Sequence, residues 1–274
     1  MRCAVVGHVE WIDFVPVERV PRPGEIVTTV KHWGEPGGGG AVAAGEFKRL
    51  GADTTFYVAV GDDELGRRTA EELGTWGLRL ELAVRAAPQR RGFTYVDAEG
   101  ERTITVLGEK LHAHGGDPLA WDELVATDAV YFTGGDIGAL RQARRGRILV
   151  ATARELPTLA EAGVELDVLV HSARDSGERY EPGVLDPAPR LVVSTEGAAG
   201  GRYAAVGGEK GRWASTAPPG PIRDMYGAGD CFAAALAFAL AEGRAVPGAL
   251  AFAAERGALA MTRRGVGGNP SDTS

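Results

Sequence analysis

The sequence predicts an α/β fold in which a mostly parallel sheet is covered by helices on both faces and carries a small β appendage. Its second half alternates short apolar segments with helical segments, which is typical of parallel strands buried on both faces. A hairpin pattern in the first half lies outside this alternation. The chain of 274 residues is long enough for one such domain, and no repeat or long linker divides it. We therefore expect a single domain over residues 1–274.

The first part of the chain predicts strands, a helix and two loops rich in proline or glycine. Residues 2–7 form an apolar run that ends in glycine, as a buried strand does, and residues 16–25 carry proline breakers. Polar residues follow the first strand where a dinucleotide-binding protein would open a glycine-rich helix, which argues against that class. Further strands are expected at 26–30 and 54–60, with helices at 41–50 and from 61–64 onward.

Two hairpins and the alternating segments account for the rest of the chain. The hairpins are expected at 92–97 with 102–107, around a turn glycine, and at 202–206 with 210–214. Between them we expect strands at 129–132, 148–150, 168–170 and 191–194, and helices at 137–144 and 155–162. A buried helix at 231–241, a last helix at 247–261 and a loop at 265–270 complete the chain.

The composition is ordinary for a globular protein of a reducing compartment. The net charge of −7 and the lack of a basic run argue against a nucleic-acid partner. Cys3 and Cys231 lie far apart in apolar runs and are expected to be buried free thiols. Residues 1–15 lack the apolar core of a signal peptide, and 231–241 is too short to span a bilayer. We expect a cytoplasmic protein that contacts no membrane.

A glycine-rich turn before the buried helix is a candidate anion site. The helix at 231–241 follows Gly227-Ala228-Gly229-Asp230. Free amides and the helix dipole attract an anion at such an end, and glycine permits close approach. Asp230 is then a carboxylate beside a bound anion, although the residue alone is explained equally well as a helix cap.

A second glycine run, Pro36 followed by residues 37–40, leads directly into the helix at 41–50. Linkers rarely run straight into a good helix, so these amides also suggest a ligand site. Several familiar sites are absent from the sequence: the phosphate-binding loop Gly-x4-Gly-Lys-Ser/Thr, the zinc motif His-Glu-x-x-His, Cys-x-x-Cys and the nucleophile elbow Gly-x-Ser-x-Gly.

The two glycine motifs resemble the paired signatures of the ribokinase-like (PfkB) carbohydrate kinases. Residues 36–66 are similar to the N-terminal signature, and 224–230 to the C-terminal signature Asp-Thr-x-Gly-Ala-Gly-Asp, in the same order and at a similar separation. The similarity extends over nearly the whole chain. It implies a ribokinase-like three-layer αβα sandwich with a small β-sheet lid, built from segments at about 11–30 and 91–107.

The resemblance also implies transfer of the ATP γ-phosphoryl group to a hydroxyl, with ATP and Mg²⁺ as cofactors and a monovalent cation left open. Asp230 would be the base, and its helix N-terminus would lower its pKa and keep it ionised. The other implied roles are an anion hole at Gly227, Ala228 and Gly229; acceptor binding by Asp13, Gly37, Gly38 and Gly39; nucleotide binding by Thr195, Gly197 and Asp224; and an indirect Mg²⁺ contact at Asp175.

Departures from the family pattern bear on the acceptor and on the nucleotide side. Val42 stands where many members carry Asn, and Gly39 where ribokinases carry Lys, so polar groups facing a sugar are lost and a small neutral sugar or polyol is expected rather than ribose. The residues after Asp224 are Met225 and Tyr226 instead of small hydroxyl residues. The family motif Asn-x-x-Glu reads Ser172-Ala173-Arg174-Asp175 here.

Three alternatives remain open from the sequence. A nucleoside kinase of the same fold is the first, with Trp11 and Phe14 beside Asp13 as a stacking pocket. A sugar-phosphate kinase that uses Arg90 and Arg91 is the second. The third is a catalytically silent sugar- or nucleotide-binding protein, which has no need to keep Asp230 between its glycines.

The hairpin at 92–107 also predicts a homodimer. Phe93, Tyr95, Ile104 and Val106 give it apolar surface, and a lone hairpin is marginal in water. That surface must cover the active site or a partner's lid. The resemblance implies both, through a two-fold dimer.

Overall fold

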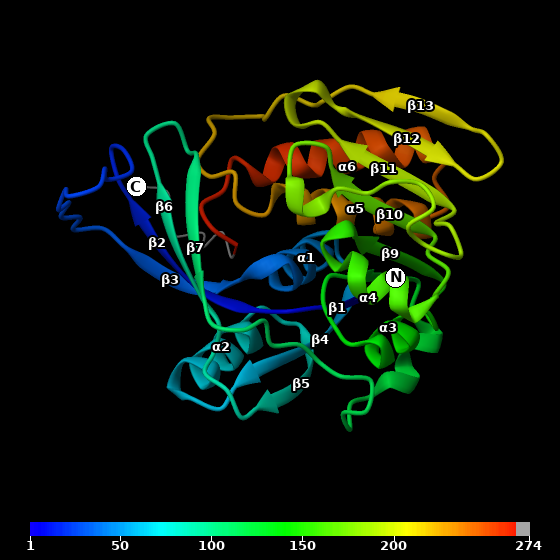
Figure 1. Ribbon diagram of the computed structural model, residues 1–274, viewed down its shortest axis with the longest axis horizontal. Coiled ribbons are helices and arrows are strands. Elements are labelled where there is room, and N and C mark those ends of the chain that lie inside the picture. Colours follow the sequence, from blue (N-terminus) through cyan, green and yellow to red (C-terminus); the bar gives the residue numbers. More distant parts are fainter. Residues whose placement is uncertain (267–274) are drawn as a thin grey trace.

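A nine-stranded sheet forms the body of the protein. The computed structural model describes residues 1–266, and seven parallel strands of its large sheet are followed by two antiparallel strands at one edge (Figure 1). The strand order is β13-β12-β11-β10-β9-β8-β1-β4-β5. The strands are β1 Arg2–Val6, β4 Asp53–Gly61, β5 Arg79–Arg85, β8 Ala129–Phe132, β9 Ile148–Thr152, β10 Val168–Ser172, β11 Leu191–Thr195, β12 Gly201–Ala205 and β13 Lys210–Trp213.

Helices cover both faces of this sheet, as the alternation in the sequence predicts. Because side chains of a strand point alternately to opposite faces, Cys3 and Val5 of β1 enter one core while Ala4 and Val6 enter the other. The first core is covered by α1 Gly38–Arg49, α2 Glu64–Thr75, α5 Ala228–Ala241 and α6 Val246–Ala260, and the second by α3 Ile137–Ala143 and α4 Leu156–Ala162. The predicted three-layer α/β fold is confirmed.

A separate four-stranded sheet stands beside the body (Figure 1). Its order is β3-β2-β6-β7, with β2 Glu10–Pro16, β3 Trp33–Gly37, β6 Arg91–Val96 and β7 Arg102–Leu107. The strand expected at 26–30 is wrong, because Ile26 and Val30 are 97% and 92% exposed and the chain pairs with β2 only from Trp33. β2, β3 and β5 are strands that the sequence did not predict.

The topology places a ligand site at one end of the body. Strands run from β1 through β4 to β5 in one direction and from β8 through β11 in the other, so the order reverses beside β1. Open α/β sheets bind ligands at such a switch point, beyond the carboxyl ends of the strands. The small sheet rises from the same end, because β1 leads into β2 through residues 7–9 only.

Short helices and the remaining sequence expectations complete the fold. Cys3 and Cys231 are buried and free, as expected. Within residues 1–266 no helix is long and apolar enough to cross a membrane. The loop expected at 265–270 lies outside the described residues from 267 onward. Single 3-10 turns occur at Trp121–Ala126, Ala153–Glu155, Ser176–Glu178 and Gly197–Ala199.

Candidate active site

A cavity of about 650 Å³ lies between the small sheet and the carboxyl ends of the parallel strands. The body contributes the residues that follow β1, β8, β9, β10 and β11, and the small sheet contributes β2 and β7. Most lining side chains are polar or charged: His8, Glu10, Arg90, Arg102, Lys110, Tyr131, Thr133, Thr152, Arg154, Ser172, Asp175, Glu178, Thr195, Tyr226 and Asp230. Gly38, Gly39, Gly227 and Gly229 also line it.

The N-terminus of α5 opens into this cavity. Gly227 precedes the helix with a left-handed backbone at φ 73°, and the first intrahelical bond runs from the Cys231 amide to its carbonyl. The amides of the first turn therefore have no partner within the helix, and they carry the positive end of its dipole. This arrangement suits a negatively charged group beside Gly229.

Asp230 is not a helix cap. Its Oδ1 accepts a hydrogen bond from the Tyr131 hydroxyl at 3.1 Å, and the start of α5 has no side-chain cap bond. Real caps occur elsewhere in the chain, for example at α2, where Asp63 Oδ1 accepts from the Gly66 amide at 2.7 Å. The Asp230 carboxyl group is thus free to face the cavity.

The expected lowering of the Asp230 pKa is wrong. Burial raises the pKa of this carboxyl group above its ordinary value, although the hydrogen bond from Tyr131 and the charges of Arg154, Arg102 and Lys110 oppose that rise. Loss of water around the charged form outweighs these partners. A raised pKa makes the carboxylate a stronger proton acceptor than a solvated aspartate.

The two glycine motifs meet at Asp230. A Cβ atom at Gly39 would lie 2.8 Å from Asp230 Oδ1 and 3.0 Å from Thr133 Oγ1, so only glycine fits there. Gly38 has φ +82° and lines the cavity beside His8. Gly37 lies behind them, outside the lining, where a Cβ atom would overlap Ile12.

Tyr226 joins the same two motifs. The Gly38 amide donates to the Tyr226 hydroxyl at 2.6 Å, and the Tyr226 ring packs edge-on against Phe14 of β2, 5.4 Å between centroids. Tyr226 stands where the family has a small hydroxyl residue. Its side chain therefore connects the start of α5 to the start of α1 and to the small sheet.

Of the two acids of β2, Glu10 faces the cavity and Asp13, the residue expected from the sequence, does not. Asp13 points to the face of the small sheet away from the cavity, where it pairs with Arg91 at 2.8 Å and accepts from Trp11 Nε1. Glu10, three residues earlier and so on the opposite face, lines the cavity. Its Oε1 lies 2.9 Å from Arg90 Nε, and burial raises its pKa.

Val42 does not line the cavity either. It is 3% exposed and packs with Cys231, and a Cβ atom at Gly227 would lie 2.7 Å from Val42 Cγ1. Val42 therefore packs against the turn at Gly227 and does not face the cavity. Gly229, by contrast, has no atom within 4 Å of its Cβ position and no positive φ, so the strict backbone requirement is at Gly227.

The three residues expected to bind the nucleotide lie in different surroundings. Thr195, at the end of β11, lines the cavity. Gly197 is exposed in the following turn and is not part of the lining. Asp224 is 2% exposed and accepts from the Tyr226 and Gly265 amides at 2.8 and 3.1 Å. The Asp224 side chain therefore stabilises the turn that precedes α5, and it is not accessible to a nucleotide.

Asp175 faces the cavity together with Glu178 and Arg154. Arg154 forms ion pairs with both carboxylates, at 3.0 Å to Glu178. The other oxygens accept from the amides of Gly177 and Ser172. Every carboxylate oxygen of this pair already has a partner, and residues 1–266 contain no group of three His, Cys, Asp or Glu side chains that could hold a metal ion.

Several cavity residues were not identified from the sequence, among them Glu10, Tyr131, Arg154 and Glu178. Glu10 and Tyr131 lie on strands whose faces the sequence did not settle, and Arg154 and Glu178 lie in turns with no motif. Alternation along Glu10–Pro16 puts Glu10 on the side of Ile12 and Phe14, but Trp11 and Val15 on the Asp13 side are also buried, so the sequence carries no signal that selects Glu10.

A carboxylate beside the open N-terminus of a helix, at the switch point of a parallel sheet and under a small second sheet, suits a phosphotransferase that acts on an alcohol. The family model of the pfkB family carbohydrate kinases matches residues 1–175 and 148–273. The chain belongs to this family, and it is an ATP-dependent carbohydrate kinase.

Curated relatives agree with this assignment, and solved structures share the fold of the chain. A ribokinase of Bacillus subtilis is 27% identical over 97% of this chain and 95% of its own, and one of Arabidopsis thaliana is 26% identical over 95% and 76%. The structure of Arabidopsis thaliana ribokinase complexed with ribose and ATP has a TM-score of 0.73 at 21% identity, covering 96% and 93%. An adenosine kinase from Sinorhizobium meliloti has a TM-score of 0.74 at 16%, covering 96% and 94%.

Proposed function

We propose that this protein phosphorylates a hydroxyl group of a small neutral sugar or polyol, with Asp230 as general base and the amides of Gly227, Ala228 and Gly229 as the anion hole. The observation that carries the proposal is the meeting of the two glycine turns at Asp230. There the position of a Cβ at Gly39 is only 2.8 Å from Asp230 Oδ1, so an acceptor on the glycine run lies beside the carboxylate group of the base.

In the proposed reaction the acceptor lies on Gly38 and Gly39, beside Glu10. Its hydroxyl oxygen forms a bond to the γ-phosphorus of ATP while the bond from that phosphorus to the bridging oxygen breaks, and ADP leaves. The hydroxyl proton goes to Asp230. The α5 amides, with Arg102 and Arg154 across the cavity, stabilise the charge on the transferred group.

The carboxylates of Asp175 and Glu178 fit a Mg²⁺ ion that is bound mainly by the nucleotide phosphates. Mg²⁺ keeps several waters and takes only one or two protein carboxylates in nucleotide sites, so a complete protein ligand set is not needed. When bound, the ion neutralises phosphate charge. Each carboxylate oxygen has a second lone pair to accept a hydrogen bond from such a water.

The walls of the cavity favour a small acceptor over a nucleoside. Trp11 lies on the outer face of β2, and Phe14 is buried against Trp33 and Tyr226, so the stacking pocket considered from the sequence is not formed. The aromatic side chains that line the cavity are Tyr131 and Tyr226, and both hydroxyls have partners.

A sugar-phosphate acceptor is also less well supported. Arg90 is paired with Glu10, and Arg91 is paired with Asp13 on the far face of the small sheet. Neither guanidinium group is therefore unpaired and available to bind the phosphate group of a sugar-phosphate acceptor.

The proposed function is tested by ATP consumption against a panel of neutral sugars, polyols, sugar phosphates and nucleosides. We expect turnover with at least one neutral sugar or polyol. Turnover only with nucleosides would replace the proposed acceptor, and no acceptor-dependent ADP release from a folded, ATP-binding protein would indicate a silent binding protein.

Glu10→Gln is expected to lower kcat/KM for the true acceptor by about tenfold or more, mainly through KM, because a hydrogen bond to a charged group contributes roughly 1.5–3 kcal/mol. Asp13→Asn is the matched control, an acid on the same strand with its side chain on the other face, and should leave kcat/KM near the wild-type value. Equal effects of the two changes would remove Glu10 from the acceptor site.

We also propose a homodimer through the outer face of the small sheet. This face carries a hollow of about 420 Å³ lined by Phe93, Tyr95, Val15 and Val27 among others, next to the exposed Ile26 and Val30. Ile104 and Val106 line the active-site cavity instead, so the hairpin has apolar groups on both faces. Apolar surface of this kind is typical of an interface.

Sedimentation velocity at micromolar concentration should give a dimer, and Phe93→Glu should shift it toward monomer by placing a charge in the apolar interface. Val206→Glu is the control, since Val206 is 70% exposed on the far β12–β13 turn and should remain dimeric. A strict monomer for the wild-type protein would count against the interface.

A further inference from the structure

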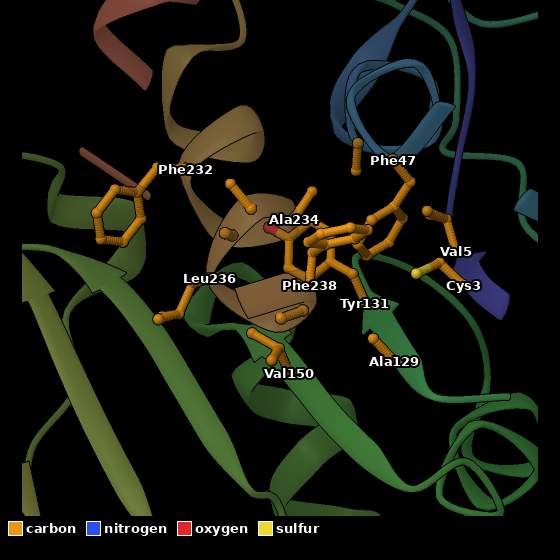
Figure 2. Close-up of a cluster of buried hydrophobic side chains, with 14 of the residues drawn as sticks. Cys3, Val5, Phe47, Ala129, Tyr131, Val150, Phe232, Ala234, Leu236 and Phe238 are labelled. Atoms are coloured by element: carbon orange, nitrogen blue, oxygen red, sulfur yellow. The ribbon is translucent and has the colours of Figure 1, made fainter. Parts of the chain in front are cut away.

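Tyr131 is a buried residue that contacts the proposed base. It lies on β8 with 2% of its surface exposed, and Figure 2 shows its ring beside Phe47 and helix α5. Its hydroxyl group donates to Asp230 Oδ1 at 3.1 Å. The other carboxylate oxygen, Oδ2, has no hydrogen-bond partner among the described residues.

The direction of this hydrogen bond follows from the chemistry of its two groups. An ionised carboxylate has no proton to donate and can only accept, so the Tyr131 hydroxyl is the donor. Burial and the nearby carboxylates raise the Tyr131 pKa, so the phenol stays protonated.

Charged groups from several elements face the same carboxylate. The cations are Arg154 after β9, Arg102 of β7 and Lys110 after β7, and the like charges are Glu10 of β2 and Glu178 in the turn after β10. Arg154, Arg102 and Lys110 all lower the pKa of Asp230, and so does the Tyr131 hydrogen bond. Of these groups, Tyr131 is the one joined to the carboxylate by a hydrogen bond.

We propose that Tyr131 is a positioning residue for the general base: it donates to Asp230 Oδ1 and so fixes the orientation of the carboxylate toward the acceptor hydroxyl. The alternative is that a buried phenol has simply found a hydrogen-bond partner, as most do. The proposal rests on the proposed function, because a base needs orientation only if it takes a proton.

Two tyrosine-to-phenylalanine variants separate these readings. Tyr57→Phe is the matched control: Tyr57 is 1% exposed on β4 of the same sheet, and its hydroxyl donates at 2.9 Å to the Ala120 carbonyl, on the sheet face away from Asp230. Both variants delete one buried hydroxyl and one hydrogen bond. We expect comparable losses in melting temperature from both.

The dependence of kcat and kcat/KM on pH should differ between Tyr131→Phe and Tyr57→Phe. Asp230 must be ionised to accept a proton, so kcat/KM falls as pH drops through its pKa. Removing the Tyr131 donor raises that pKa, so Tyr131→Phe should move the acid limb of the profile to higher pH. We expect roughly tenfold or more loss of kcat below the limb, partly recovered in alkali, with a small change in acceptor KM. Tyr57→Phe should keep the wild-type limb.

A second measurement does not depend on turnover. The ¹³C carboxyl signal of Asp230, assigned by its absence in Asp230→Asn, should titrate at higher pH in Tyr131→Phe than in wild-type protein. An unchanged acid limb and unchanged titration in Tyr131→Phe overturn the proposal. Failure of the proposed function looks different, because wild-type protein would then release no acceptor-dependent ADP while the carboxyl titration still reports on Tyr131.

Discussion

Asp230→Asn is expected to lower kcat by roughly 10²- to 10⁴-fold, the usual cost of losing a positioned proton acceptor. The amide keeps the shape of the side chain and can still accept from the Tyr131 hydroxyl. It cannot take the acceptor proton. The measurement is steady-state kcat with the acceptor found in the panel, at a pH above the acid limb.

The same change should leave the melting temperature equal to or above that of wild-type protein. Burial raises the pKa of Asp230, which means that the ionised form is disfavoured in the folded state and that a neutral amide removes this cost. Asp63→Ala is the control, because it removes a real helix cap outside the cavity lining, together with a hydrogen bond from the Gln89 amide. It should cost about 1 kcal/mol of stability or more while kcat stays near the wild-type value. A near-normal kcat for folded Asp230→Asn would contradict the proposed role of Asp230 as general base.

Gly227→Ala is expected to lower both stability and turnover. A non-glycine residue at φ 73° costs about 1–2 kcal/mol, and the new Cβ lies 2.7 Å from Val42 Cγ1, an overpacking that adds about 1–3 kcal/mol. The first turn of α5 must shift to accommodate it. Displacing one donor of an oxyanion site typically costs about 10²-fold or more in kcat.

Two further variants assign the cause. Gly229→Ala has open space around its Cβ and no positive φ, so it should retain the wild-type melting temperature while its methyl group obstructs the phosphoryl group and lowers turnover. Adding Val42→Ala to Gly227→Ala should remove the overlap but not the backbone strain, and so restore only part of the lost stability. Equal melting temperatures for Gly227→Ala and Gly229→Ala would contradict this account.

The sequence predicted the body of the fold well because its parallel strands are buried on both faces and so appear as continuous apolar runs. It failed at 26–30, where an apolar pattern has no neighbouring strand to pair with, and at Glu10–Pro16, where polar residues interrupt the run. The residue proposed to bind the acceptor could not be predicted for a similar reason. Glu10 and Asp13 are both acids on one strand, and only knowledge of which face is covered selects between them.

The site was predicted where a motif and a backbone conformation coincide, as at Gly227 to Asp230, and missed where strand register decides. Tyr131 meets Asp230 because β8 lies beside β1 under α5, a contact between residues far apart in the chain. The pKa of Asp230 is of the same kind: the helix dipole can be inferred from the sequence, but the degree of burial cannot.

The junction between β3 and α1 has a consequence for how acceptor preference can change. β3 ends at Gly37 and α1 begins at Gly38, with no loop between them, so the small sheet and the glycine turn that we propose to bind the acceptor are one continuous piece of chain (Figure 1). A chimaera that takes its small sheet from a relative therefore also inherits the glycine turn of that relative, unless the crossover separates Gly37 from Gly38. To keep sheet and turn together, the crossover has to fall inside α1, beyond the glycines of the proposed acceptor site.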